Sequence, residues 1–181
     1  MENKDVIFAR ENRKKAIELI PIKTIKKEEL LFNAIKNSKR NSEHKLMELY
    51  KFMDELSQPF KHLTPCKSKC SHCCHIKVDV SDFEMLQIKN NAKKQVRKAV
   101  LGRVIGEPCP FLIDDSCSIY EFRPFVCRRH QVFTPTSKLC EKESELGQEL
   151  LNFTEVDKAF NYILSESGLY SQKDIRKYFI K

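Results

Sequence analysis

The thiol groups of this sequence are concentrated in one part of the chain. All eight cysteines lie between residues 66 and 140, and four of them fall within residues 66–74. Cysteines that serve only as small buried residues have no reason to cluster, whereas thiolates that hold a metal must do so. Spacings of three and two residues within the first group let a turn present two sulfurs to one ion. The candidate metal ligands are Cys66, Cys70, Cys73, Cys74, Cys109, Cys117, Cys127 and Cys140.

The rest of the sequence bears on the chemical state of these thiols. The N-terminal residues lack the continuous apolar segment of a secretory signal, so we expect a cytoplasmic protein whose cysteines are thiols or metal thiolates rather than disulfides. No apolar run approaches the roughly 20 residues that a membrane helix needs, and no membrane partner is expected. The 181 residues, 41% hydrophobic and 32% charged, predict one compact domain.

Eight thiols allow three arrangements of metal. They can form two tetrahedral zinc sites, or one [4Fe–4S] cluster on four cysteines with the others structural or redox-active, or one zinc site beside buried free thiols. Adjacent side chains point in different directions, so Cys73 and Cys74 serve two ions, or one ion and the interior, more easily than a single ion. The cofactor is therefore Zn²⁺ or a [4Fe–4S] cluster, and the sequence leaves that choice open.

Other side chains near the cysteines can assist the metal. His72, His75 and His130 are possible imidazole ligands, although a position outside the ligand set is the simpler interpretation. Arg123 and Arg128 are expected to lie next to the cofactor without coordinating the metal. There they would donate hydrogen bonds to sulfur and offset the negative charge of the thiolates.

Hydrophobic periodicity and capping patterns predict helices on both sides of the cysteines. The segment Ser81–Glu84 is a capping box, and Gly102 is a natural stop for the helix that it begins. Two similar patterns begin at Thr154 and Ser171. Residues 103–140 are expected to be rich in loops, with a short hairpin or a short helix near 119–122. Helices are predicted at 1–20, 26–37, 42–56, 81–101, 154–167 and 171–179.

The predicted fold class is mainly α, a small metal-stapled domain with an irregular cysteine-rich metal-binding centre and helical extensions. Residues 1–60 form the N-terminal helical extension, residues 61–140 the cysteine-cluster metal-binding domain, and residues 141–181 the C-terminal helices that pack on it. Because the cysteine-rich segment offers little apolar surface to bury, metal ligation is expected to stabilise it.

Several segments resemble a known family when taken together. They are Cys66-x3-Cys70-x2-Cys73-Cys74, Cys109-Pro-Phe, Cys117-Ser-Ile-Tyr and Arg123-Pro-x2-Cys127-Arg. In this order they are similar to the YkgJ-type cysteine-cluster family, a zinc- or iron-chelating domain that also occurs in flagellin lysine-N-methylases. The similarity spans about residues 62–140. The resemblance implies metal chelation by the matching cysteines, with an iron–sulfur cluster as one form of it.

The favoured function is that of a metal-binding module with a possible protein partner. An iron–sulfur-dependent enzyme, such as a protein lysine methylase or a redox protein, is the first alternative, although those methylases are much longer chains. A zinc-ribbon-like nucleic-acid-binding module is the second, suggested by the net charge of +8. The lysines are spread along the chain, so nucleic acid is not the favoured partner. No glycine-rich phosphate loop and no H-E-x-x-H motif identifies a catalytic site.

Overall fold

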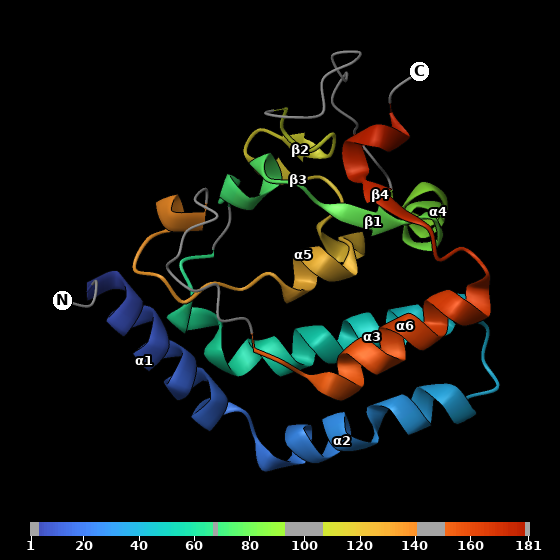
Figure 1. Cartoon of the computed structure of the whole chain (residues 1–181), viewed down its shortest axis with the longest axis horizontal. Helices are drawn as coiled ribbons and strands as arrows, with labels where there is room; N and C mark the ends of the chain where they lie inside the picture. The colour runs from blue at the N-terminus through green and yellow to red at the C-terminus, as the bar shows by residue number, and fades with distance from the viewer. Residues whose placement is uncertain (1–3, 67–68, 93–106, 141–150, 180–181) are drawn as a thin grey trace.

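A computed structural model describes residues 4–66, 69–92, 107–140 and 151–179 of the chain. Within these ranges, four long helices form a base, and the segments that carry the cysteines lie together on one side of it (Figure 1). The described residues are mainly helical with two small sheets, so the predicted fold class is confirmed. In the described residues, no helix has the length and apolar character that crossing a membrane requires.

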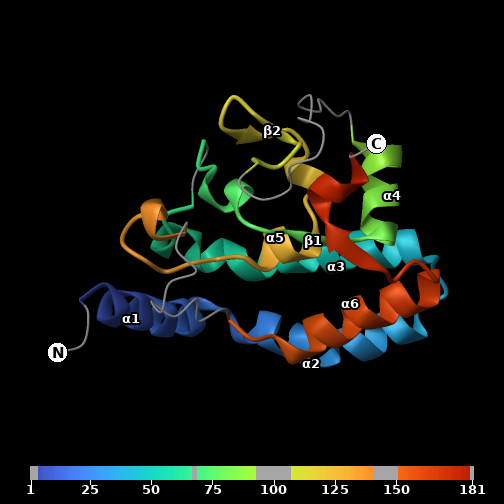
Figure 2. The same cartoon turned by 45° about the horizontal axis from the view of Figure 1, so that its top comes forward.

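The helical base consists of α1 (Lys4–Leu19), α2 (Ile22–Asn37), α3 (Ser42–Ser57) and α6 (Thr154–Ser167). Helices α2, α3 and α6 pack against one another, and α1 packs against the 3₁₀ helix η1 (Gln58–Leu63) that follows α3. Figure 2 shows α2 and α6 side by side beneath α3. The predicted apolar face of α3 is buried in this base, as are the inner faces of α2 and α6.

Two helix starts in the base differ from the predictions. Helix α2 begins at Ile22, four residues earlier than expected, because the carbonyl of Pro21 accepts the first amide hydrogen bonds, including one from Thr24 at 2.8 Å. The predicted cap at Thr154 is wrong, since Thr154 is already helical and Phe153 precedes it. Instead, the Glu28 carboxylate on α2 accepts the amide hydrogen of Glu155 at 2.9 Å. A tertiary contact replaces the local cap.

The cysteine-bearing part contains short elements joined by loops. They are the 3₁₀ helix η2 (His72–His75), β1 (Asp79–Ser81), α4 (Asp82–Asn91), β2 (Leu112–Ile113), β3 (Ser116–Cys117), the 3₁₀ helix η3 (Tyr120–Phe122), α5 (Phe125–Arg129) and the 3₁₀ helix η4 (Ser137–Cys140). The predicted capping box starts α4, with Ser81 and Glu84 in reciprocal hydrogen bonds. The predicted end of this helix near Gly102 lies outside the described residues.

Strands β2 and β3 form a hairpin within the loop-rich segment, a few residues before the position 119–122 at which a hairpin or a short helix was expected. Its turn residues, Asp114 and Asp115, have φ values of 47° and 57°, the left-handed conformation of a two-residue hairpin turn. The short helix expected near 119–122 is η3. Helix α5 is an element that sequence patterns did not predict.

The C-terminal segment returns to the cysteine-bearing part. Residues Gln172–Asp174 form β4, which pairs antiparallel with β1, and only then does the 3₁₀ helix η5 (Ile175–Tyr178) begin. The prediction that Ser171 starts a helix is therefore wrong. Pairing with β1 takes the backbone hydrogen bonds that a helix would have used. In Figure 1 this red segment lies beside β1 and α4.

Two separate clusters of buried apolar side chains are present in the described residues. The larger cluster fills the helical base and includes Phe125 of α5, whose ring stacks on that of Phe160 in α6 with 4.0 Å between ring centres. The smaller cluster lies under the cysteine-bearing loops, between β1, α4, the hairpin and η5. It consists of Val78, Val80, Met85, Ile88, Phe111, Ile119 and Ile175.

Candidate metal centre

The predicted ligands come from six short segments that the fold brings to one side of the helical base. Cys66 and Cys70 precede η2, Cys73 and Cys74 lie in η2, and Cys117 ends the hairpin strand β3. Cys109 precedes the hairpin, Cys127 lies in α5 and Cys140 ends η4. All eight are free thiols in the structure.

Four thiols form a first group near η2 and η4. Burial raises the pKa of Cys66, and the neighbouring thiols of Cys70 and Cys73 raise it further. Burial raises the pKa of Cys140 to about 12, and the same three thiols contribute to that increase. The packing of η4 against η2 is what brings Cys140 to these residues. The first thiol group is therefore Cys66, Cys70, Cys73 and Cys140.

The other four thiols form a second group over the smaller apolar cluster. The amide of Cys109 donates to the carbonyl of Cys74 at 2.7 Å, which joins their two segments. The pKa of Cys127 is raised by burial and then by the thiols of Cys109, Cys73 and Cys117. Cys109, Cys117 and Cys127 all pack against the smaller apolar cluster. The second thiol group is therefore Cys74, Cys109, Cys117 and Cys127.

The adjacent cysteines Cys73 and Cys74 lie at the junction of the two groups. A hydrogen bond from the Cys74 thiol lowers the pKa of Cys73 to about 7, and the charges of His72 and Arg123 act in the same direction. The same hydrogen bond and burial raise the pKa of Cys74. Cys73 is therefore the thiol that most readily becomes a thiolate, and the thiolate is the form of cysteine that binds metal.

The sulfur atoms are donors that zinc and iron bind, but in the described part of this structure they are too far apart to coordinate one ion. Thiolates are ligands that zinc and iron–sulfur clusters favour. Among the described residues, no three cysteine, histidine or acidic side chains converge tightly enough to hold a metal. The thiols within each group interact electrostatically, so metal binding requires the sulfurs of a group to move closer together rather than a new fold.

The three candidate histidines differ in their surroundings. His75 is exposed at the end of η2, whereas His72 acts on Cys73 through its charge. His130, just after α5, is partly buried, and burial lowers its pKa. Its Nε2 atom is buried without a hydrogen-bond partner in the described residues. None of these observations makes an imidazole a member of either thiol group.

Arg123 and Arg128 lie between the thiols and α3. Both donate to the carboxylate of Asp54, Arg123 through Nη2 at 3.1 Å, and Arg128 also donates to the carbonyls of Arg123 and Glu121. The guanidinium of Arg128 stacks on the ring of Tyr50. Burial raises the pKa of Cys117 above its usual value, and the charges of both arginines partly offset that increase. The two arginines thus act on the thiols electrostatically while they anchor α5 to the base.

The two aromatic neighbours have different roles. Phe111 is fully buried in the smaller apolar cluster, and its ring meets the edge of Phe179 with 5.4 Å between ring centres. Tyr120 is 53% exposed and stacks against Arg123 instead of covering the thiols. Phe111 therefore belongs to the apolar cluster against which Cys109, Cys117 and Cys127 pack.

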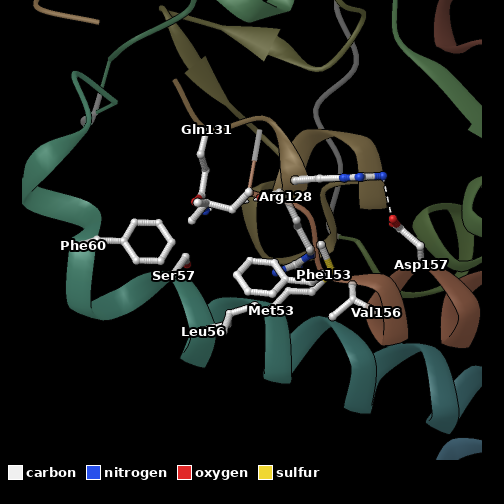
Figure 3. A pocket seen from close by; sticks show the side chains of 11 residues that line it. Met53, Leu56, Ser57, Phe60, Arg128, Gln131, Phe153, Val156 and Asp157 are labelled. Carbon is white, nitrogen blue, oxygen red and sulfur yellow. Dashed lines mark hydrogen bonds and ion pairs between the residues drawn. The ribbon is translucent and has the colours of Figure 1, made fainter. Parts of the chain in front are cut away.

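A small pocket lies next to this site, between α3, α5 and the start of α6 (Figure 3). Its floor is apolar, with Met53, Phe60 and Val156 among the lining residues, and an ion pair between Arg129 and Asp157 at 2.8 Å crosses its edge. The cavity volume of about 30 Å³ is the space of roughly one water molecule. This pocket is too small for an organic substrate.

Sequence patterns missed the residues that hold the cysteine segments in place. The Glu84 carboxylate accepts 2.7 Å hydrogen bonds from the Tyr50 hydroxyl and from the Phe125 amide, so it joins α4 to α3 and α5. Its capping-box role was predictable, but these two partners were not. Asp174 and Arg176 in the C-terminal segment are likewise buried and bonded to the cysteine loops. No sequence signal marked either residue.

Comparison with known proteins identifies the cysteine-bearing part. Residues 65–149 match the CxxCxxCC family, whose description is "Putative zinc- or iron-chelating domain". This match contains all eight cysteines and confirms the resemblance found in the sequence. Searches of curated proteins and of solved structures returned no significant match.

Proposed function

We propose that this chain, which belongs through residues 65–149 to the zinc- or iron-chelating CxxCxxCC family, holds its metal in two four-thiol sites. The first thiol group would form one site and the second thiol group the other. The protein would act as a metal-binding module rather than through a substrate pocket. The observation that carries the proposal is that Cys109, Cys117 and Cys127 pack together on the smaller apolar cluster, with the Cys109 amide bonded to Cys74, while η4 packs against η2 and brings Cys140 to the other thiols.

The arrangement of Cys73 and Cys74 supports two sites. Cys73 raises the pKa of Cys66 and Cys140 in the first group, and also that of Cys117 and Cys127 in the second. Cys74 is joined to Cys109 by a backbone hydrogen bond, and the thiols of Cys109 and Cys117 raise its pKa. A tetrahedral site closes with four thiolates, so two groups of four use all eight thiols without a remainder.

The surroundings also suit a charged thiolate centre. Four thiolates around one Zn²⁺ leave a net charge of about −2, which nearby cations offset. Arg123 and Arg128 already act on Cys117 in this way, and Arg123 acts on Cys73. The two arginines would favour the charged form of these thiols and partly offset the effect of burial, without becoming ligands.

The first experiment is metal analysis of the whole chain purified without oxygen, combined with an absorption spectrum. We expect two zinc ions per chain in a colourless protein. A brown protein with iron and acid-labile sulfide would assign the same cysteines to iron–sulfur chemistry and would favour the redox or methylase alternative. A metal-free chain with a fully ordered cysteine-bearing part would overturn the proposal.

Single cysteine substitutions test the division into two groups. Cys70→Ser is expected to release the metal of the first group only, and Cys109→Ser that of the second group only. Each variant would then retain one ion per chain. Loss of both ions from either variant would indicate one shared cluster, and retention of both would exclude that cysteine as a ligand.

Proton competition gives a further test. Burial raises the pKa of Cys109 to about 11 and that of Cys127 above its usual value, so these thiols carry protons at neutral pH before metal binds. Metal binding must displace those protons. The affinity for Zn²⁺ should therefore rise between pH 6 and pH 8, as measured by competition with a chelator of known affinity. An affinity independent of pH would contradict thiolate ligation.

A further inference from the structure

Arg176 lies outside the part of the chain that matches the chelating domain, yet it reaches into the second thiol group. It belongs to η5, near the C-terminal end, and is only 5% exposed. The segment that carries it is fixed by strand β4, which pairs with β1, and by a 2.9 Å hydrogen bond from the Ile175 amide to the Val78 carbonyl.

The guanidinium group of Arg176 donates in three directions. Nε donates to the Glu107 carbonyl at 2.6 Å. Nη2 donates to the carbonyls of Cys74 at 3.1 Å and Ile76 at 3.0 Å. Nη1 donates to the Asp174 carboxylate at 3.0 Å. The planar guanidinium is suited to such a set of acceptors because its donors point outward in a fixed fork.

Asp174 holds this guanidinium in position and neutralises it. Its carboxylate is 2% exposed and accepts from the amide of Arg176 at 2.8 Å and from the amide of Val78 at 3.2 Å. A buried carboxylate with a guanidinium partner and backbone donors has its charge compensated, which an isolated buried charge would not. The pair is therefore a rigid attachment point rather than a mobile surface contact.

The acceptors of Arg176 are the backbone groups that place two ligands of the second thiol group. One is the carbonyl of Cys74 itself, and another is that of Glu107, two residues before Cys109. The same Cys74 carbonyl also accepts the amide of Cys109 at 2.7 Å. Arg176 thus joins the segments of Cys74 and Cys109, which are distant in sequence, at the point where their thiols meet.

We propose that Arg176, oriented by Asp174, is a positioning residue for the second metal site, so that the C-terminal segment is an integral part of that site. This inference rests on the proposed two-site function. The first thiol group, which lies near η2 and η4, does not depend on this contact. Loss of Arg176 should therefore weaken one site and leave the other unchanged.

The test compares Arg176→Met with Lys177→Met, a change at the neighbouring exposed residue of η5. Methionine keeps the unbranched apolar stem of arginine, although it is shorter, and it donates no hydrogen bond. We expect Arg176→Met to weaken Zn²⁺ binding at one of two sites by about 10- to 100-fold, the usual effect of losing a group that orients ligands. Lys177→Met should bind two ions with the affinity of the unaltered chain.

Combined variants identify which site is affected. In a Cys70→Ser background only the second group remains, so adding Arg176→Met should remove the remaining tight site. In a Cys109→Ser background only the first group remains, and adding Arg176→Met should change nothing. Equal weakening in both backgrounds, or none in either, would overturn the inference while the two-site function stands. An unaltered chain that binds no metal would instead refute the function itself.

Milder changes keep the test valid if Arg176→Met fails to fold, as judged by circular dichroism of the helical base. Arg176→Lys keeps the positive charge, but a single ammonium group cannot reach all the acceptors of the guanidinium. Asp174→Asn removes the negative charge that orients the guanidinium. Each should weaken the second site selectively, by less than Arg176→Met. With Co²⁺ as a probe, the sulfur-to-cobalt absorption of the second site should decrease at subsaturating metal. Spectra identical to those of the unaltered chain in both variants would contradict the positioning role.

Discussion

The helical base and the cysteine-bearing part of this protein are held together by different forces. Among the described residues, the larger apolar cluster contains 21 buried side chains, all but Phe83, Phe125 and Phe133 from the base, whereas that under the cysteine loops contains seven. Burial of apolar surface can stabilise the first unaided, but it is too limited in the second. The cysteine-bearing part depends instead on directed contacts: the carboxylate of Glu84, the guanidinium of Arg176 and, as proposed, thiolate–metal bonds.

This difference explains how the two parts are joined. The base presents Tyr50 and Asp54 on α3, and these bind Glu84 and the two arginines of the cysteine-bearing part. Phe125 adds the stacked contact with Phe160. A stable helical surface therefore holds short segments that could not fold on so small a core of their own.

Removal of metal should produce the largest effect. With a strong chelator, the cysteine-bearing part should lose its order while the helical base persists, because structural zinc contributes on the order of 10 kcal/mol to such sites. Hydrogen exchange of amides in 107–127 and in α3 measures both parts at once. Equal protection of the two parts, both before and after chelation, would show that the same forces stabilise them.

Leu49→Ala should instead destabilise the helical base and leave metal binding unchanged. Leu49 is fully buried in the base, and a cavity there should lower the free energy of unfolding by about 2–5 kcal/mol. Thermal unfolding of the metal-bound chain gives the change in stability, and metal analysis of the folded protein should still give two ions. The exposed Met47 of the same helix offers a control, since Met47→Ala should change stability little.

Glu84→Gln should have a smaller effect, but in both parts. One carboxylate oxygen accepts from Tyr50 and Phe125 and the other accepts from Ser81, and an amide in its place cannot accept on both atoms, at a cost of about 1–3 kcal/mol. Denaturant unfolding gives this value. Protection from hydrogen exchange should fall in α5 as well as in α3. A loss confined to α4 would mean that the amide oxygen keeps the contacts with Tyr50 and Phe125 and that only those with Ser81 are lost.

The exposed ion pair between Lys27 and Glu55 should matter least. Its atoms are 2.8 Å apart, but the side chains are 56% and 41% exposed, so Lys27→Met should change the free energy of unfolding by less than about 1 kcal/mol. Denaturant unfolding at low and high salt checks this. A change above 2 kcal/mol would show that the base relies on surface charge more than on its core.

Local patterns predicted the elements that form from local interactions. The apolar spacing of α3 and the capping box at Ser81 each led to a helix in the structure. The patterns at Thr154 and Ser171 misled, because Glu28 supplies the hydrogen bond for α6 and strand pairing takes residues 172–174. Helix α5 was missed since five residues carry too little periodicity to detect.

The sequence by itself determined the chemistry of this protein: which thiols are available, that they fall within one segment, and that helices surround them. These properties depend on residue types and on spacings over a few positions, and both can be read directly from a sequence. Only the tertiary structure decided which thiols meet, because Cys74 and Cys109 or Cys66 and Cys140 are joined by chain folding rather than by spacing. For the same reason only the structure revealed Arg176, whose partners lie about a hundred residues away in the chain.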